Sequence, residues 1–150
     1  MNKKHKIIIV LIVVLFIGGL SVYLFTNKNS LDGKVVKKSS INLNNYKDNI
    51  ILKKGGEYTL TGEFEHSVLI DSSEKVILNL NNVDIENKVN TAIANINNNQ
   101  LVINILENTK NELSSRGESE YDGCIFSNGE IIINGPGSLK IRGRQKEGDS

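Results

Sequence analysis

The stretch that decides the fold is "EIIINGPGSLKI", residues 130–141, in which two short apolar runs flank the turn residues "NGPG" at 134–137. Asn-Gly between apolar runs is the strongest short-range signal for a β-hairpin, whose two strands pair with each other in antiparallel fashion. A hairpin would place Ile133 beside Leu139. At a corner, by contrast, each run would pair with another part of the chain, and the residues upstream decide between the two.

The same layout occurs twice more, in "KVILNLNNVDIEN" at 75–87 and "QLVINILENTKNEL" at 100–113. Each copy has a strand, a polar corner and a shorter second strand. The apolar starts Val76, Leu101 and Ile131 are separated by 25 and then 30 residues. Smaller strands, "SVLIDS", "TAIANI" and "GCIFSN", lie before or between these copies. A period between about 20 and 50 residues indicates a repeat architecture.

This repeat predicts an all-β fold, a parallel β-helix of about three coils, because stacked coils bury inward side chains that one coil leaves exposed. A meander or sandwich of hairpins is the alternative, but it does not explain the repeated strand order. In the β-helix, equivalent apolar residues lie above one another. We therefore expect continuous ladders from the residues Leu78, Leu80, Leu101, Ile103, Ile131 and Ile133.

The N-terminal part predicts a membrane anchor. An uncharged run from Ile7 to Phe25 has 19 residues, close to the ~20 needed for a transmembrane helix. It is longer than the apolar region of a cleaved signal peptide and lacks a good cleavage site, so we favour an uncleaved signal anchor. We expect residues 1–6 to be a cytoplasmic tail, 7–25 the transmembrane helix and 26–50 a polar stalk. The predicted location is the cell membrane, single-pass, with the C-terminal domain extracellular.

Charge and cysteine content exclude several functions. Without Lys3, Lys4 and Lys6, the remainder has 15 basic against 17 acidic residues, so no basic face indicates nucleic acid. Cys124 is the sole cysteine, which excludes an intrachain disulfide and a cysteine metal cluster. We expect it to be buried as a small apolar side chain.

Four blocks resemble a known family: "GGEYTLTGEF" (55–64), "VLIDSSEKVILNLNNVDIEN" (68–87), "LVINILENTKNELS" (101–114) and "YDGCIFSNGEIIINGPGSLKIRG" (121–143). They are similar to the bacterial carbohydrate-binding domain proteins, which have a right-handed, pectate-lyase-like parallel β-helix. The resemblance implies a polysaccharide-binding domain over 51–150. Family members continue for several more coils, so we expect an incomplete domain, truncated at the C-terminus. If the chain is not truncated, copies associate end to end.

Candidate site residues are few. Aromatic platforms often bind sugars; the chain has no Trp, and Phe64 and Tyr121 are the aromatic residues of the domain nearest to loops. The resemblance also implies Ca²⁺, which takes six to eight oxygen ligands. Three acidic clusters offer such oxygens, and from them we select Asp71 and Asp122 as metal ligands. The clusters are Asp71 with Glu74, Asp84 with Glu86, and Glu118, Glu120 and Asp122.

Three functions compete. The favoured one is a membrane-tethered extracellular polysaccharide-binding module without catalysis. The second is a structural or adhesive cell-surface protein that binds another protein. The third is a Ca²⁺-dependent polysaccharide lyase, whose candidate bases Arg116, Arg142 and Arg144 have no identifiable acidic partner set; the fold alone does not license this activity.

Overall fold

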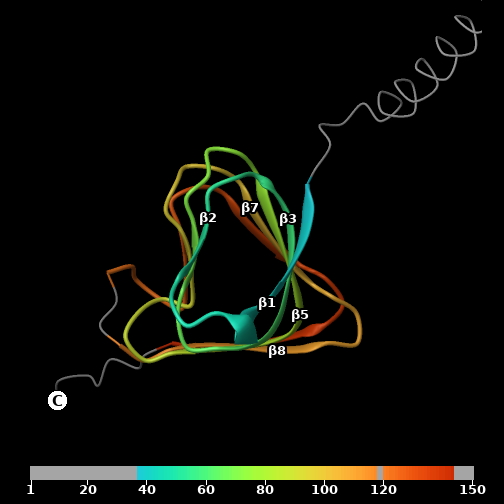
Figure 1. Ribbon diagram of the computed structural model, residues 1–150, viewed down its shortest axis with the longest axis vertical. Helices are drawn as coiled ribbons and strands as arrows, with labels where there is room; N and C mark the ends of the chain where they lie inside the picture. The colour runs from blue at the N-terminus through green and yellow to red at the C-terminus, as the bar shows by residue number, and fades with distance from the viewer. Residues whose placement is uncertain (1–36, 118–119, 144–150) are drawn as a thin grey trace, which may run out of the picture. The chain divides into compact units, whose positions relative to one another are not determined.

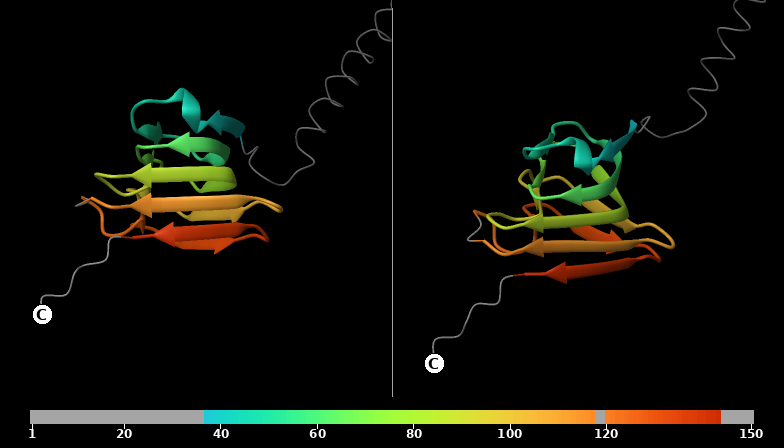
Figure 2. Two further views of the ribbon diagram at one scale, coloured as in Figure 1. Left: turned by 90° about the horizontal axis from the view of Figure 1, so that it is seen from below. Right: turned by 60° about the horizontal axis from the view of Figure 1, so that its bottom comes forward.

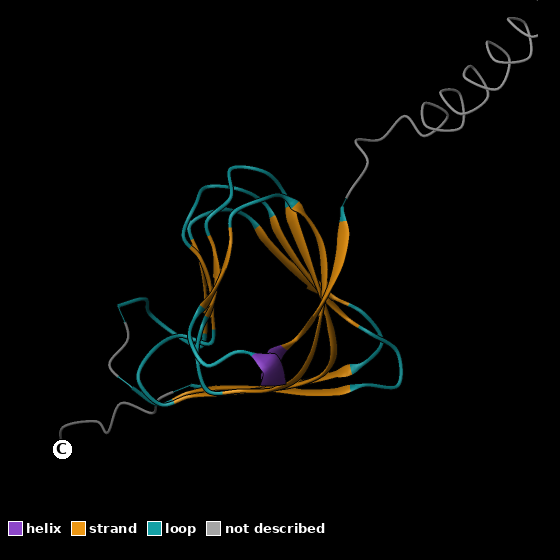
Figure 3. Ribbon diagram, viewed as in Figure 1, coloured by secondary structure: helices purple, strands orange, loops and turns teal. Residues whose placement is uncertain are grey.

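The computed structural model describes residues 37–117 and 120–143, which form an all-β structure of two parallel sheets (Figures 1 and 3). A short 3-10 helix, η1 (Leu43–Asn45), accompanies them. The larger sheet contains β1 (Lys38–Asn42), β3 (Gly56–Phe64), β5 (Val76–Asn87), β7 (Leu101–Ile105), β8 (Lys110–Ser115), β10 (Ile131–Asn134) and β11 (Ser138–Arg142). The smaller sheet contains β2 (Ile50–Leu52), β4 (Val68–Ile70), β6 (Ile93–Asn95) and β9 (Ile125–Ser127).

The stretch at 130–141 is a corner and not a hairpin. Strand β10 pairs in parallel with β7, and β11 pairs in parallel with β8, so Ile133 lies opposite Ile103 and Leu139 opposite Asn111. Gly135 makes the bend with a φ of +114°, and a Cβ atom on it would lie 2.2 Å from the carbonyl oxygen of Ile105. The corner therefore needs a glycine both for its backbone conformation and for space.

The chain passes from one sheet to the other and back, and each passage adds a parallel strand to both sheets. Figure 2 shows the resulting layers stacked on one another. Strands β3 and β5 are long enough to cover two sides of the layer, with an irregularity in their register between Leu60 and Gly62. On β5 the irregularity lies between Leu80 and Val83. The part of β5 up to Leu80 pairs with β7, and the part from Asp84 onward pairs with β8.

The core consists of columns of apolar side chains, as the repeat predicts. Leu78, Ile103 and Ile133 occupy one column, and Val76, Leu101 and Ile131 the next. Side chains of β5 and β7 in these columns are completely buried, whereas Ile131 and Ile133 on β10 are 39% and 46% exposed. Within the described residues, β10 has a strand on one side only, which explains the difference.

The folded part begins earlier than residue 51, where the sequence predicts its start. Strand β1 pairs with β3, and Leu43 in η1 is fully buried in the core. The alternation of polar and apolar residues in "SSINL" fits such a half-buried edge strand, so the last part of the predicted stalk belongs to the sheet. The predicted tail and transmembrane helix, and the stalk up to residue 36, lie outside the described residues. Among residues 37–117 and 120–143, no helix has the length and apolar character to cross a membrane.

Candidate functional site

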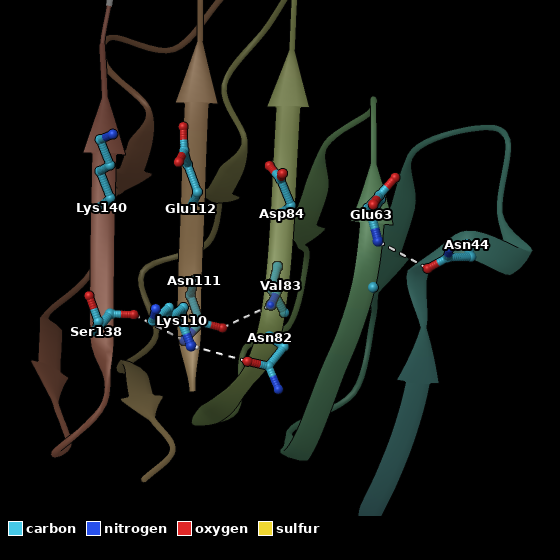
Figure 4. A pocket seen from close by; sticks show the side chains of 11 residues that line it. Asn44, Glu63, Asn82, Val83, Asp84, Lys110, Asn111, Glu112, Ser138 and Lys140 are labelled. Carbon is cyan, nitrogen blue, oxygen red and sulfur yellow. Dashed lines mark hydrogen bonds between the residues drawn. The ribbon is translucent and has the colours of Figure 1, made fainter. Parts of the chain in front are cut away.

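A row of charged side chains crosses four neighbouring strands of the larger sheet. Glu63 lies opposite Asp84, Asp84 opposite Glu112, and Glu112 opposite Lys140, on β3, β5, β8 and β11 respectively. Figure 4 shows the four residues at one level, with Asn44 beyond Glu63. We call these four residues the charged row.

Strand geometry places the charged row outside. The next residues on the first three strands, Phe64, Ile85 and Leu113, are buried in the core. Because successive side chains of a strand point to opposite faces, the charged residue that precedes each of them points to solvent. The parallel register then aligns these outward residues from layer to layer.

The charged row lines a depression of about 480 Å³ on the surface of the sheet, which we call the groove. Its lining includes three carboxylates, two ammonium groups, amides and a hydroxyl. Hydrogen-bond donors therefore lie beside acceptors, and positive groups beside negative ones. The groove is lined by Asn44, Gly62, Glu63, Asn82, Val83, Asp84, Lys110, Asn111, Glu112, Ser138 and Lys140.

Asp84 is the carboxylate at the centre of the row. Partial burial raises its pKa above the ordinary value, and the neighbouring charges of Glu112, Glu63 and Glu86 raise it further, while Arg142 opposes the shift. The guanidinium Nε of Arg142 lies 2.9 Å from Glu112 Oε1. A neutral or hydrogen-bond-donating ligand is therefore easier to place beside Asp84 than another anion.

Asparagine side chains fix the backbone that carries the row. The backbone N–H of Glu63 donates to Asn44 Oδ1 at 3.0 Å, that of Lys110 to Asn82 Oδ1 at 3.1 Å, and that of Val83 to Asn111 Oδ1 at 2.9 Å. Asn82 and Lys110, and Val83 and Asn111, belong to neighbouring layers. The amides thus tie each layer to the next at the groove and keep its wall in one arrangement.

A second depression of about 340 Å³, which we call the side depression, shares Asn44 and Glu63 with the groove. It contains Tyr46, which is 48% exposed and directly follows η1. The Tyr46 N–H donates to the carbonyl oxygen of the buried Leu43 at 3.0 Å, which anchors its backbone. The lining is Asn44, Tyr46, Lys47, Glu63, Phe64, Glu65 and His66.

The two aromatic residues selected from the sequence have different surroundings. Phe64 is 4% exposed and belongs to the core, so the exposure expected for it is wrong, because the strand alternation turns it inward. It still lines the side depression, and its role in sugar binding stays a prediction. Its ring contacts that of His66 at a centroid distance of 5.6 Å. Tyr121 is half-buried, lies ahead of β9 and packs on the ring of Phe126 at 4.9 Å. It lines neither depression, and its role in binding stays a prediction.

The predicted metal ligands are not brought together. Asp71 directly follows β4, whereas Asp122 precedes β9, and these strands run parallel in the smaller sheet. Asp71 therefore lies at the C-terminal ends of these strands, and Asp122 lies toward their N-terminal ends. Asp71 accepts a hydrogen bond from Asn97 Nδ2 at 2.8 Å. In the described part of the chain, no group of three His, Cys, Asp or Glu side chains is placed to hold a metal ion, and binding of Ca²⁺ stays a prediction.

Two of the candidate bases are engaged in ion pairs. Arg116 pairs with Glu86 at 3.0 Å and Arg142 with Glu112 at 2.9 Å; Arg144 lies outside the described residues. Cys124 is 4% exposed, as expected, and burial raises the pKa of its thiol to about 11. The thiolate that a nucleophilic role requires is thereby disfavoured.

Comparison with known families identifies the domain. The family model "Carbohydrate-binding domain-containing protein" matches residues 46–149. The chain belongs to this family. This carbohydrate-binding domain begins, in the matched range, at Tyr46 and includes the whole charged row, while Asn44 lies just before it. No curated protein and no solved structure matches the chain.

Sequence reasoning missed most of this site. Asn44 and Tyr46 lie in the predicted stalk, Asp84 belongs only to an acidic cluster, and the sequence pattern does not single out Glu63, Glu112 or Lys140. A signal was present: "GEF", "VDI", "NEL" and "LKI" each place one charged residue directly before an inward apolar or aromatic residue after a corner. Reading the four copies in register identifies the row of the carbohydrate-binding domain.

Proposed function

We propose that the protein binds polysaccharide in the groove, without catalysis. The observation that carries this proposal is the charged row, Glu63–Asp84–Glu112–Lys140, aligned across four strands in a domain of the carbohydrate-binding family. Sugar hydroxyls both donate and accept hydrogen bonds. Carboxylates accept them, and ammonium and amide groups donate them, so the lining suits a ligand with many hydroxyls.

Preorganisation favours binding by this surface. The asparagine contacts between layers hold the backbone beneath the row before any ligand arrives. A site that is already ordered loses less conformational entropy on binding than a flexible one.

The finer features of the fold and location belong to the same proposal. We infer a right-handed parallel β-helix, supported by the parallel layers and the family membership. Tethering through the uncharged run at 7–25 would present the domain outside the cell, in agreement with the length of that run.

Calorimetric titration of the full-length chain in detergent with soluble oligosaccharides tests the function. We expect Asp84→Ala to weaken binding about tenfold or more, because hydrogen bonds to charged groups contribute roughly 1.5–3 kcal/mol. Glu107→Ala is the control, since this exposed carboxylate lies between β7 and β8 and lines neither depression. Equal losses in the two variants, or no binding by the unmodified chain, would contradict the proposal.

The same titrations examine the alternatives. A rise in absorbance from unsaturated products in the presence of CaCl₂ would indicate a lyase. Heat on titration with CaCl₂ alone would indicate the Ca²⁺ binding that the resemblance implies. Saturable binding of a surface protein with no binding of any sugar would favour the adhesive function.

End-to-end association of copies is a further proposal for this domain. Ile131, Ile133 and Ile141 in the last described layer are 39%, 46% and 48% exposed, and exposed apolar patches of this kind mark interaction surfaces. Sedimentation of the chain over a range of concentrations measures it. A constant sedimentation coefficient would exclude association in that range.

A further inference from the structure

Two depressions that share residues suggest one longer binding surface. Asn44 and Glu63 line both the groove and the side depression, so the two depressions adjoin each other at these residues. Starting at Lys140, the lining crosses β11, β8, β5 and β3 and continues past Asn44 to Tyr46. The direction of this surface is across the strands and not along them.

The spacing along this direction suits a polymer of sugars. Neighbouring strands lie about 4.8 Å apart, which is close to the length of one pyranose unit in an extended, β-linked glycan. Each strand can therefore meet a successive sugar with the next residue of the charged row. The row covers four such positions, and Tyr46 stands at a fifth.

Tyr46 has the properties of a sugar platform at that fifth position. It is the described aromatic residue with the largest exposure, at 48%, and its backbone is anchored to the buried Leu43. A tyrosine ring supplies a large apolar face with few rotatable bonds, so ordering it costs little entropy. Asn44, two residues before Tyr46, accepts a hydrogen bond from the backbone N–H of Glu63, which ties the segment that carries Tyr46 to the first strand of the charged row.

The charges select the ligand class. The carboxylates of Glu63, Asp84 and Glu112 outnumber the ammonium groups of Lys110 and Lys140, so a polyanion meets net repulsion along this surface. An uncharged glycan avoids this repulsion, and its hydroxyls can bind to both the carboxylates and the ammonium groups.

We propose that the groove and the side depression form one surface for an extended uncharged glycan, which lies across the strands with about one sugar per strand and its end stacked on Tyr46. This inference rests on the proposed function and deepens it, because it assigns a direction, a ligand class and a terminal position to the same site.

The test measures affinity against chain length. The full-length chain in detergent is titrated with β-1,4-linked oligomers of glucose, xylose and mannose, from disaccharide to heptasaccharide, and with polygalacturonate as a polyanionic comparison. We expect affinity for at least one uncharged series to rise up to about five units and then level off.

Variants at Tyr46 locate the end of the surface. Tyr46→Ala should weaken binding of the pentasaccharide and longer oligomers roughly three- to tenfold, with the trisaccharide unchanged, whereas Tyr46→Phe should keep the affinity. Ile51→Ala is the matched control, because Ile51 is 51% exposed on β2 and lines neither depression. Equal thermal midpoints of Tyr46→Ala and the unmodified chain show that folding is intact.

The outcomes separate this inference from the proposed function. Length-dependent binding that Tyr46→Ala leaves unchanged, or weakens equally for the trisaccharide, overturns the inference while groove binding stands. Binding of polygalacturonate without binding of any uncharged series also overturns it and keeps a polysaccharide function. Binding of no sugar overturns both.

Discussion

Gly62 packs so closely against the side chain of Asn44 that there is no space for a side chain at position 62. Gly62 has a φ of +91°, and a Cβ atom on it would lie 1.8 Å from Asn44 Oδ1. Gly62→Ala therefore combines an unfavourable backbone conformation with a steric clash. We expect it to reduce the free energy of unfolding by about 1–3 kcal/mol, measured by denaturant titration.

Gly143→Ala provides the matched control, because a Cβ atom there has no neighbour within 4 Å and Gly143 is not among the residues with positive φ. Asn44→Ala by itself removes the hydrogen bond from the Glu63 N–H, so the clash is tested by a double-mutant cycle: Gly62→Ala should cost less in the Asn44→Ala background than in the unmodified chain. Equal stability of Gly62→Ala and Gly143→Ala would show that the contact is not as tight as described.

Asp84 gives the charged row a pH dependence. Its pKa is raised by burial, then by Glu112, Glu63 and Glu86, so the folded state binds more protons than the unfolded state in the window between the two pKa values. Stability from this group is complete below the unfolded pKa and declines as the pH rises through the folded pKa. Asp84→Asn should raise the thermal midpoint at pH 7 relative to the unmodified chain.

The comparison is repeated at pH 3, where the advantage of Asp84→Asn should disappear because the carboxyl is protonated in both states. Asp122→Asn serves as the control for removing an exposed carboxylate. An advantage that persists unchanged at pH 3 would mean that the effect does not come from the charge.

At the scale of the strands, amide side chains form a second row on the outer face of the larger sheet. Asn79 Nδ2 donates to Glu57 Oε1 at 2.9 Å, and Asn79 Oδ1 accepts from Asn104 Nδ2 at 3.0 Å. The hydrogen bond from Asn79, and then Lys38, lowers the pKa of Glu57. Because Asn79 is 6% exposed, Asn79→Ala leaves polar groups on both neighbouring strands without this partner. We expect a loss of about 1–3 kcal/mol in unfolding free energy.

A titration of Glu57 followed by NMR adds a direct readout of that row. Asn79→Ala should raise the pKa of Glu57 toward its ordinary value, so that its contribution to stability disappears at a higher pH as the solution is acidified. Asn98→Ala, at an exposed corner position, should change neither quantity. An unaltered Glu57 pKa in Asn79→Ala would contradict the role of the row.

The strands themselves were largely predictable, whereas the site was not. Val76, Leu101 and Ile131 start equivalent strands because the alternation of apolar side chains repeats, and their register follows from that pattern. The site depends on contacts between layers whose connecting segments differ in length. Tyr46 illustrates this: its position beside Glu63 follows from the docking of η1, which a single stretch of polar sequence does not indicate.

At the scale of the whole described domain, stability should differ from layer to layer within a column. Ile103 and Ile133 are register partners on β7 and β10, yet Ile103 is fully buried and Ile133 is 46% exposed. Ile103→Ala should cost about 2–5 kcal/mol, and Ile133→Ala about 1 kcal/mol or less, both measured by denaturant unfolding.

The two substitutions remove the same atoms from equivalent positions, so each is the control for the other. Similar losses would indicate that β10 is covered in solution, for instance by a second copy of the chain. Repeating the measurement over a range of protein concentrations distinguishes this, because association makes apparent stability depend on concentration.

The in-register layers also have a consequence for how such domains change over generations. Duplication of the coding sequence for one complete layer would add a parallel strand to both sheets and one more residue to the charged row, without disturbing the existing register. An insertion of one residue within a strand would instead turn its inward side chains outward. Selection should therefore retain whole-layer duplications and eliminate single-residue insertions in the strands, and the length of the recognised glycan can grow one layer at a time.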